Sequence, residues 1–181
     1  ELDVPVVGVI ESGARAAAER TKSGQVGVIA TASTVRSGAY GRALAACRAD
    51  LVVTERACPL FVPLVEEGWI DHKVTKEIAE EYLAPLEGHN LDTLILGCTH
   101  YPLLKRLIGD VMGPGVSLVD SGEETARTVV EMLDARGLRA PAGANPVHAL
   151  YLSDLPAAFT GTAERFLGRA LPPVEVVTVS G

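Results

Sequence analysis

A cysteine and a histidine stand two residues apart after an apolar run, in the segment LILGCTHYPLL at residues 94–104. His100 can supply or remove a proton near the Cys98 thiol. Pro102 suits an early helical position, and the N–H groups and dipole of that helix would favour a thiolate. The segment is therefore typical of a thiol that transfers protons. An equally open alternative makes Cys98 a buried strand residue and His100 a hydrogen-bonded loop residue, because cysteine is among the most buried residue types.

Two threonines follow another predicted strand, and open α/β sheets bind ligands beyond the carboxyl ends of their strands. Thr31 and Thr34 could hydrogen-bond a carboxylate or an ammonium group. From the residues alone, helix capping by Thr34 or Ser33 is the favoured interpretation.

Two glutamates, Glu66 and Glu67, follow the next predicted strand and could orient His100. The usual role of such a pair, just before a glycine, is a solvated helix end. The residues alone do not decide between these roles.

The other cysteines and histidines look structural. The odd number of three cysteines and their spacing fit no zinc or disulfide framework, which indicates free thiols in a reducing, cytoplasmic compartment. Cys47 is expected in the core and Cys58 in simple packing. No metal-ligand spacing joins the remaining histidines, so no metal site is predicted: His72, His89 and His148.

Composition narrows the function further. The chain of 181 residues is 48% hydrophobic, 4% aromatic and carries a formal net charge of −7. No basic run or aromatic ladder favours nucleic acid, and no apolar stretch reaches the ~18 residues of a membrane span. No glycine-rich phosphate motif follows a strand, which argues against a nucleotide cofactor. The acidic balance repels anions at long range, so any anion site must be built from local donors.

Apolar runs alternate with helix-like stretches. Runs such as VGVIAT and DTLILGC are apolar on consecutive residues, which is typical of strands buried on both faces. This order predicts an α/β fold with an open, mostly parallel sheet and helices on both faces. Strands are expected at 4–10, 26–31, 51–54, 91–98, 116–120, 147–152 and 174–178, and helices at 13–21, 34–48, 59–68, 71–86, 102–111, 123–136 and 155–167.

Two places look like boundaries. Ser121 with Glu124 forms a capping-box pattern at the start of a helix, and residues 139–146 form a loop rich in Gly, Pro and Ala. The three elements after that loop are too few to bury a core, so they are expected to pack on something else. The first residues, ELDVPVVGVIESG, have no Met and enter an apolar run at once, which suggests a cut into a larger protein.

The segment at 94–104 resembles the second cysteine motif of glutamate racemases, which are cofactor-independent enzymes. The segments VPVVGVIESGARAA, GVIATASTVRSGAY, ACPLFVPLVEEG and VDSGEETA are similar to family segments in the family's order. The C-terminal YLSDLPAAFTGTAERFLGR is similar to the family's tail. The resemblance spans nearly the whole chain.

The resemblance implies two similar α/β lobes with the active site between them. The first lobe's Asp-Ser, Pro-Tyr-Gly and Ala-Cys-Asn-Thr motifs do not occur here. By resemblance, residues 1–10 are a strand that crosses from the missing first lobe, 11–120 are the second lobe, and 121–181 return to the first lobe. Each lobe supplies one thiol, because inversion at Cα needs a proton removed from one face and delivered to the other.

Residue by residue, the resemblance makes Cys98 the thiol on the L-glutamate face, His100 its acid/base assistant and Glu66, with Glu67 as fallback, the partner of the histidine. Thr99, Thr31 and Thr34 match substrate-holding positions. The resemblance implies glutamate as substrate, D-glutamate for peptidoglycan as product, no cofactor or metal, and a possible homodimer. The alternatives are an aspartate or other amino-acid racemase, and a catalytically incomplete lobe that acts only in binding.

Overall fold

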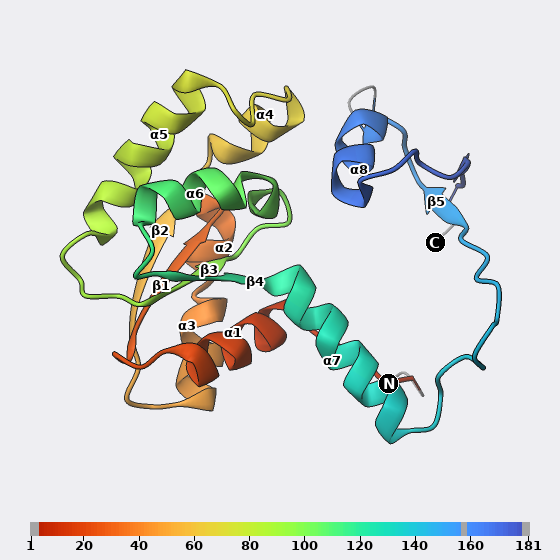
Figure 1. Ribbon diagram of the computed structural model, residues 1–181, viewed down its shortest axis with the longest axis horizontal. Helices are drawn as coiled ribbons and strands as arrows, with labels where there is room; N and C mark the ends of the chain where they lie inside the picture. The colour runs from red at the N-terminus through yellow and green to blue at the C-terminus, as the bar shows by residue number, and fades with distance from the viewer. Residues whose placement is uncertain (1–3, 157–158, 179–181) are drawn as a thin grey trace.

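A sheet of four parallel strands forms the centre of the molecule in the computed structural model, which describes residues 4–156 and 159–178 (Figure 1). The strand order is β2-β1-β3-β4, and every neighbouring pair is parallel. The order changes direction between β1 and β3. The expected open parallel sheet is confirmed, with strands β1 (Gln25–Ala30), β2 (Val52–Ala57), β3 (Thr93–Leu96) and β4 (Ser117–Asp120).

Helices cover both faces of this sheet, as expected (Figure 1). On one face, Ile29, Leu94 and Leu96 pack in a core cluster with residues of α4 (Phe61–Glu66), α5 (Lys73–Leu83) and α6 (Lys105–Met112). On the other face, Val28 and Ile95 pack with residues of α1 (Val9–Arg20) and α3 (Ala39–Cys47). Strands β1 and β3 are therefore buried on both sides, which explains their unbroken apolar sequences.

The strand expected at residues 4–10 is wrong. None of the described segments pairs with residues 4–8, and Val4 and Val6 are 63% and 76% exposed. A strand needs a neighbouring strand to accept its backbone hydrogen bonds. Without one, helix α1 begins at Val9, where the Ser12 hydroxyl donates to the Gly8 carbonyl and the alanines that follow enter the core.

The helix expected at 34–48 is divided into α2 (Ala32–Ser37) and α3 by Gly38, which has the left-handed φ of 60°. This conformation favours glycine. The division changes the face that the second helix presents, and Cys47 is exposed rather than in the core. The expected capping box is also wrong, because Asp120 caps α7 (Ser121–Ala135) by accepting from the amides of Gly122 and Glu123.

The C-terminal tail forms a separate small unit. After an exposed stretch it contains β5 (Leu150–Leu152), α8 (Phe159–Leu167) and β6 (Val174–Val176), with β5 and β6 paired in parallel. Several of its apolar side chains remain exposed, including Val147 at 94% and Tyr151 at 59%. In the part of the chain that the structure describes, no helix has both the length and the apolar character to cross a lipid bilayer.

Asp92 joins the entrance of β3 to the turn between α1 and β1. Its carboxylate accepts hydrogen bonds from the hydroxyls of Thr21 and Thr93 and from the amides of Lys22 and Ser23. Burial acts to raise the pKa of Asp92, but these hydrogen bonds outweigh it and hold the pKa well below its usual range. The carboxylate thereby fixes one end of the two central strands.

We expect Asp92→Asn to lower the free energy of unfolding by about 1–3 kcal/mol at neutral pH. Since the folded pKa is lowered, this contribution is complete above the ~3.9 of an unfolded aspartate and is lost as pH falls through the folded value. Urea unfolding should therefore show a larger difference from wild type at pH 7 than at pH 3. Asp50→Asn is the matched control, because Asp50 is an exposed carboxylate that pairs with Arg48. An equal loss in both variants would contradict the role of Asp92.

Candidate active site

The candidate site lies at the carboxyl ends of the strands, where the strand order changes direction. Chain exits from β1, β3 and β4 bring Thr31, Cys98 and Asp120 to the same edge of the sheet. Open parallel sheets bind ligands at this position, because the loops of the two central strands diverge there and leave a crevice.

Gly97 allows the chain to leave β3 at this point. Its amide donates to the Ile29 carbonyl at 2.8 Å, which extends the β1–β3 pairing by one residue. A Cβ atom on Gly97 would lie 2.8 Å from Cε2 of Tyr40 and 3.0 Å from the Ile29 oxygen. The short 3-10 helix η2 (Tyr101–Leu104) follows directly, and the buried Tyr101 hydroxyl donates to the Cys58 carbonyl. Both ends of the Cys98 turn are thus fixed.

Cys98 is half-buried and lines a cavity of about 560 Å³. Burial raises the pKa of its thiol, and hydrogen bonding with the backbone N–H of His100, the Thr99 side chain and the N–H of Tyr101 acts in the opposite direction. The net shift is upward, so the expected preference for a thiolate is wrong for this chain. The cavity is lined by Val9, Tyr40, Leu96, Gly97, Cys98, Thr99, Pro102, Asp120, Ser121, Gly122, Glu123 and Phe166.

His100 lies between two polar partners. Its Nε2 is 3.4 Å from Oε1 of Glu66, and its Nδ1 is 3.3 Å from the Thr99 hydroxyl. These contacts fit the tautomer in which Nε2 carries the proton and Nδ1 accepts from Thr99. Glu66 therefore occupies the position expected for the partner of the histidine, whereas Glu67 lines a separate groove beside Trp69.

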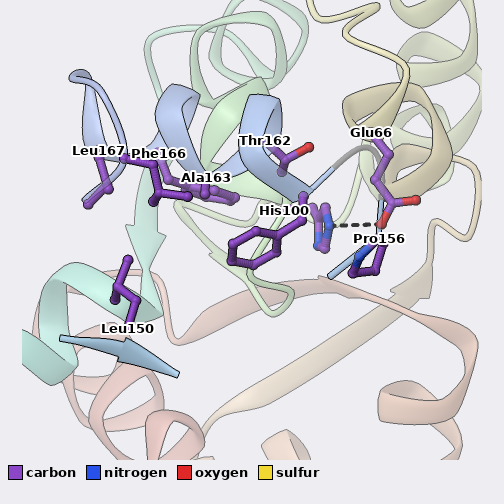
Figure 2. Close-up of a pocket in the computed structure, with 10 residues that line it drawn as sticks. Glu66, His100, Leu150, Pro156, Thr162, Ala163, Phe166 and Leu167 are labelled. Atoms are coloured by element: carbon purple, nitrogen blue, oxygen red, sulfur yellow. Dashed lines mark ion pairs between the residues drawn. The ribbon is translucent and has the colours of Figure 1, made fainter. Parts of the chain in front are cut away.

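A second cavity of about 550 Å³ lies beside His100 and Glu66, on the side facing the tail. Figure 2 shows the α8 side chains along one side of this cavity and Glu66 on the other, with His100 between them. Its lining is mostly apolar: Leu150, Pro156, Phe159, Thr162, Ala163, Phe166, Leu167 and Leu171 accompany the two polar residues.

The two threonines after β1 are not among the lining residues of either cavity. Thr31 is the N-cap of α2, and its hydroxyl lies 3.0 Å from that of Thr34 and accepts from the Thr34 amide at 3.4 Å. The capping interpretation thus holds for this loop, with Thr31 rather than Thr34 or Ser33 as the cap.

Among the lining residues that the sequence did not predict as part of a site are Tyr40, Ser121 and Phe166. The buried Tyr40 hydroxyl lies 3.0 Å from that of Ser121, and burial raises the pKa of the phenol. Phe166 is on α8, and its ring lies 6.3 Å from that of His100 at an interplanar angle of 79°. Tyr40 and Phe166 belong to no spacing pattern, and the pattern that contains Ser121 indicated only a helix start. The one available signal was that a buried phenol such as that of Tyr40 needs a hydrogen-bond partner.

Cys58 has a different environment from Cys98. It is fully buried beneath α4, and burial raises its pKa to about 12, which makes it chemically inert at neutral pH. Across residues 4–156 and 159–178, His, Cys, Asp and Glu side chains form no group of three or more that could coordinate a metal ion.

We expect Gly97→Ala to displace the Cys98 turn and to destabilise the fold by about 1–3 kcal/mol, because the new methyl group meets the Tyr40 ring and the Ile29 backbone. Gly115→Ala is the matched control, since a Cβ there has no atom within 4 Å. Thermal unfolding of the two variants tests the difference. Equal melting temperatures would contradict the close approach at Gly97.

We expect alkylation of Cys98 by iodoacetamide to be slow at neutral pH and to rise through a midpoint above the ~8.5 of a free cysteine, because burial disfavours the thiolate. Mass spectrometry of each thiol over a range of about pH 6–10 measures this, with the exposed Cys47 as internal control. A midpoint at or below that of a free thiol would contradict the effect of burial.

Comparisons with known proteins agree with this fold. The family model described as Asp/Glu/Hydantoin racemase matches residues 1–129. The glutamate racemase of Geobacter metallireducens is 52% identical over 98% of this chain, which spans 66% of that relative's length. A crystal structure of a Bacillus anthracis glutamate racemase matches with a TM-score of 0.90 at 39% identity, over 98% of this chain and 66% of that one. A Francisella tularensis glutamate racemase, solved in complex with D-glutamate, matches with a TM-score of 0.88 at 31% identity, over 97% of this chain and 65% of that one. The chain belongs to the Asp/Glu/hydantoin racemase family.

Proposed function

We propose that this chain carries one of the two proton-transferring thiols of a glutamate racemase, which interconverts L- and D-glutamate without a cofactor. The observation that carries the proposal is the Cys98 turn, where a half-buried thiol faces a cavity beside a histidine paired with Glu66. Relatives of 49–52% identity that are named glutamate racemases support the choice of substrate.

Cys98 exchanges a proton with Cα on one face of the substrate, and a thiol outside this chain acts on the other face. The raised pKa of Cys98 means that burial favours the thiol form, which can donate its proton. In the opposite direction, His100 removes the thiol proton and Glu66 stabilises the imidazolium that results. Because the roles exchange with direction, Cys98 donates its proton as a thiol in one direction and needs the His100 base to become a thiolate in the other.

Substrate binding is proposed for Thr99, Thr31 and Thr34. Thr99 lines the Cys98 cavity, so its hydroxyl can reach a bound carboxylate. Thr31 and Thr34 lie at the end of the neighbouring strand β1, and their mutual hydrogen bond would have to rearrange to serve a ligand. A carbanion at Cα requires donors of this kind arranged in advance around the carboxylate.

The complete active site is proposed to lie between two lobes. Residues 11–120 are the second lobe, 1–10 cross from a first lobe, and 121–181 return to it. The chain spans less than two thirds of the length of its relatives' sequences, at 66% and 64%. Exposed apolar residues before α1 and before β5 support a further packing partner, since Val6 and Val147 are 76% and 94% exposed. The same proposal includes a cytoplasmic location, assembly as a homodimer, and supply of D-glutamate for peptidoglycan.

Racemisation of L-glutamate and L-aspartate by the complete natural protein tests the substrate. We expect turnover of glutamate with exchange of the Cα proton in heavy water, and little turnover of aspartate. Aspartate turnover equal to or faster than that of glutamate would favour another racemase of the family. The 181-residue chain alone should not racemise either amino acid; turnover that Cys98→Ala abolishes would contradict the need for a second thiol.

Substitution of the glutamates tests the role of Glu66. We expect Glu66→Gln to lower kcat by about 10–100-fold, because His100 loses its charge partner; this is less than the roughly 10²–10⁴-fold contributed by a group that transfers the proton itself, since Glu66 acts through His100. Glu67→Gln is the matched control, since Glu67 is the next residue but faces the groove beside Trp69. The same loss in both variants would assign the effect to the end of α4 rather than to the ion pair.

A further inference from the structure

We propose that Phe166, on the tail helix α8, is a positioning residue of this site: its ring covers the side of the Cys98 cavity that faces the tail and holds the His100 imidazole toward Glu66. The inference rests on the proposed function and extends it to a residue outside the motifs around the thiol.

Phe166 is shared by the linings of both cavities. Every other residue that lines the Cys98 cavity comes from the part of the chain between Val9 and Glu123. The cavity beside His100, in contrast, is lined mostly by the tail (Figure 2). The ring of Phe166 therefore stands where the tail meets the thiol cavity, and it separates that cavity from the one beside His100.

The imidazole of His100 is held by three groups. Glu66 lies at Nε2, the Thr99 hydroxyl lies at Nδ1, and the Phe166 ring stands edge-to-face at 6.3 Å. The two polar contacts, at 3.4 and 3.3 Å, are long and leave the ring free to tilt. An edge-to-face aromatic contact restricts that tilt without offering a competing hydrogen bond. The imidazole is only 23% exposed as a result.

Helix α8 has a contact that keeps Phe166 in this place. The guanidinium of the neighbouring Arg165 lies against Gly68 at the end of α4, where a Cβ would be 2.7 Å from Nη2. The close approach allows the tail helix to rest on the same turn that carries Glu66. Phe166 remains 44% exposed, so it covers the cavity only in part; an apolar side chain here still reduces the access of water, which strengthens the polar contacts that stabilise charge during proton transfer.

The test compares alkylation of Cys98 in Phe166→Ala, Phe166→Leu and Phe159→Ala variants of the complete natural protein. Phe159 is the matched control, because it is the same residue type on the same helix and lines only the cavity beside His100. Iodoacetamide rates over a range of pH, measured by mass spectrometry with Cys47 as reference, report cover of the thiol without any need for racemase activity. The other titratable groups lining the Cys98 cavity, Tyr40, Asp120 and Glu123, are unchanged in all three variants.

We expect Phe166→Ala to raise the Cys98 alkylation rate about 3–10-fold and to move its midpoint to lower pH, because burial is what disfavours the thiolate. Phe166→Leu preserves most of the apolar volume and serves as the test if the alanine variant fails to fold. It should raise the alkylation rate about twofold. Phe159→Ala should leave rate and midpoint unchanged. Wild-type values in the folded Phe166 variants, or equal changes in Phe159→Ala, would overturn the proposal.

Racemase kinetics of the same variants separate this proposal from the function on which it rests. If the complete protein racemises glutamate, Phe166→Ala should lower kcat about 10-fold with a smaller change in KM, and Phe166→Leu should recover part of the loss. If the complete protein does not racemise glutamate, the proposed function fails, whereas the alkylation rates still decide whether Phe166 covers Cys98. A fall in kcat of Phe166→Ala with an unchanged Cys98 alkylation rate would contradict the proposal that Phe166 covers the thiol.

Discussion

The hydrogen bond from the Gly97 amide to the Ile29 carbonyl is the constraint on which the site depends. It continues the β1–β3 pairing one residue beyond β3, so the chain leaves the sheet at Cys98 and no earlier. Both strands are buried on two faces, which prevents a slip of register that would turn every side chain over. The position of the thiol is therefore a property of the sheet rather than of a flexible loop.

The difference between Cys98 and Cys58 shows what the turn adds. Both thiols follow strands of the same sheet, and burial raises the pKa of each. For Cys58 the charge of Arg56 opposes the effect of burial, and the pKa still rises to about 12. For Cys98 the amides of the turn and the Thr99 hydroxyl stabilise the thiolate and limit the rise. The turn therefore gives Cys98 donors that can stabilise a thiolate, whereas Cys58 has none from its own turn.

The sequence predicted the sheet well because buried parallel strands are apolar without interruption, and β1 and β3 both follow that rule. The same rule failed at residues 4–10, since an apolar run does not reveal whether a pairing strand exists. Cys98 and His100 were predictable because they are neighbours in the chain. Geometry distinguishes Glu66 from Glu67 only once the three-dimensional position of α4 is known. Phe166 is separated from His100 by more than sixty residues of chain, so no local sequence pattern could predict their contact.

The acidic groups around the thiol affect how a negatively charged ligand could bind there. A chain of net charge −7 repels an anion at long range, so binding must depend on donors at short range. The nearby carboxylates are engaged within the protein: Asp120 caps α7, Glu123 pairs with Lys105, and Glu66 faces His100. The charges of Asp120 and Glu123 are thereby partly offset by a helix end and by Lys105, and Glu66 accepts from the imidazole N–H. In the proposed function, a substrate carboxylate would bind beside the Thr99 hydroxyl, and an imidazolium formed at His100 would be balanced by Glu66 rather than by the substrate.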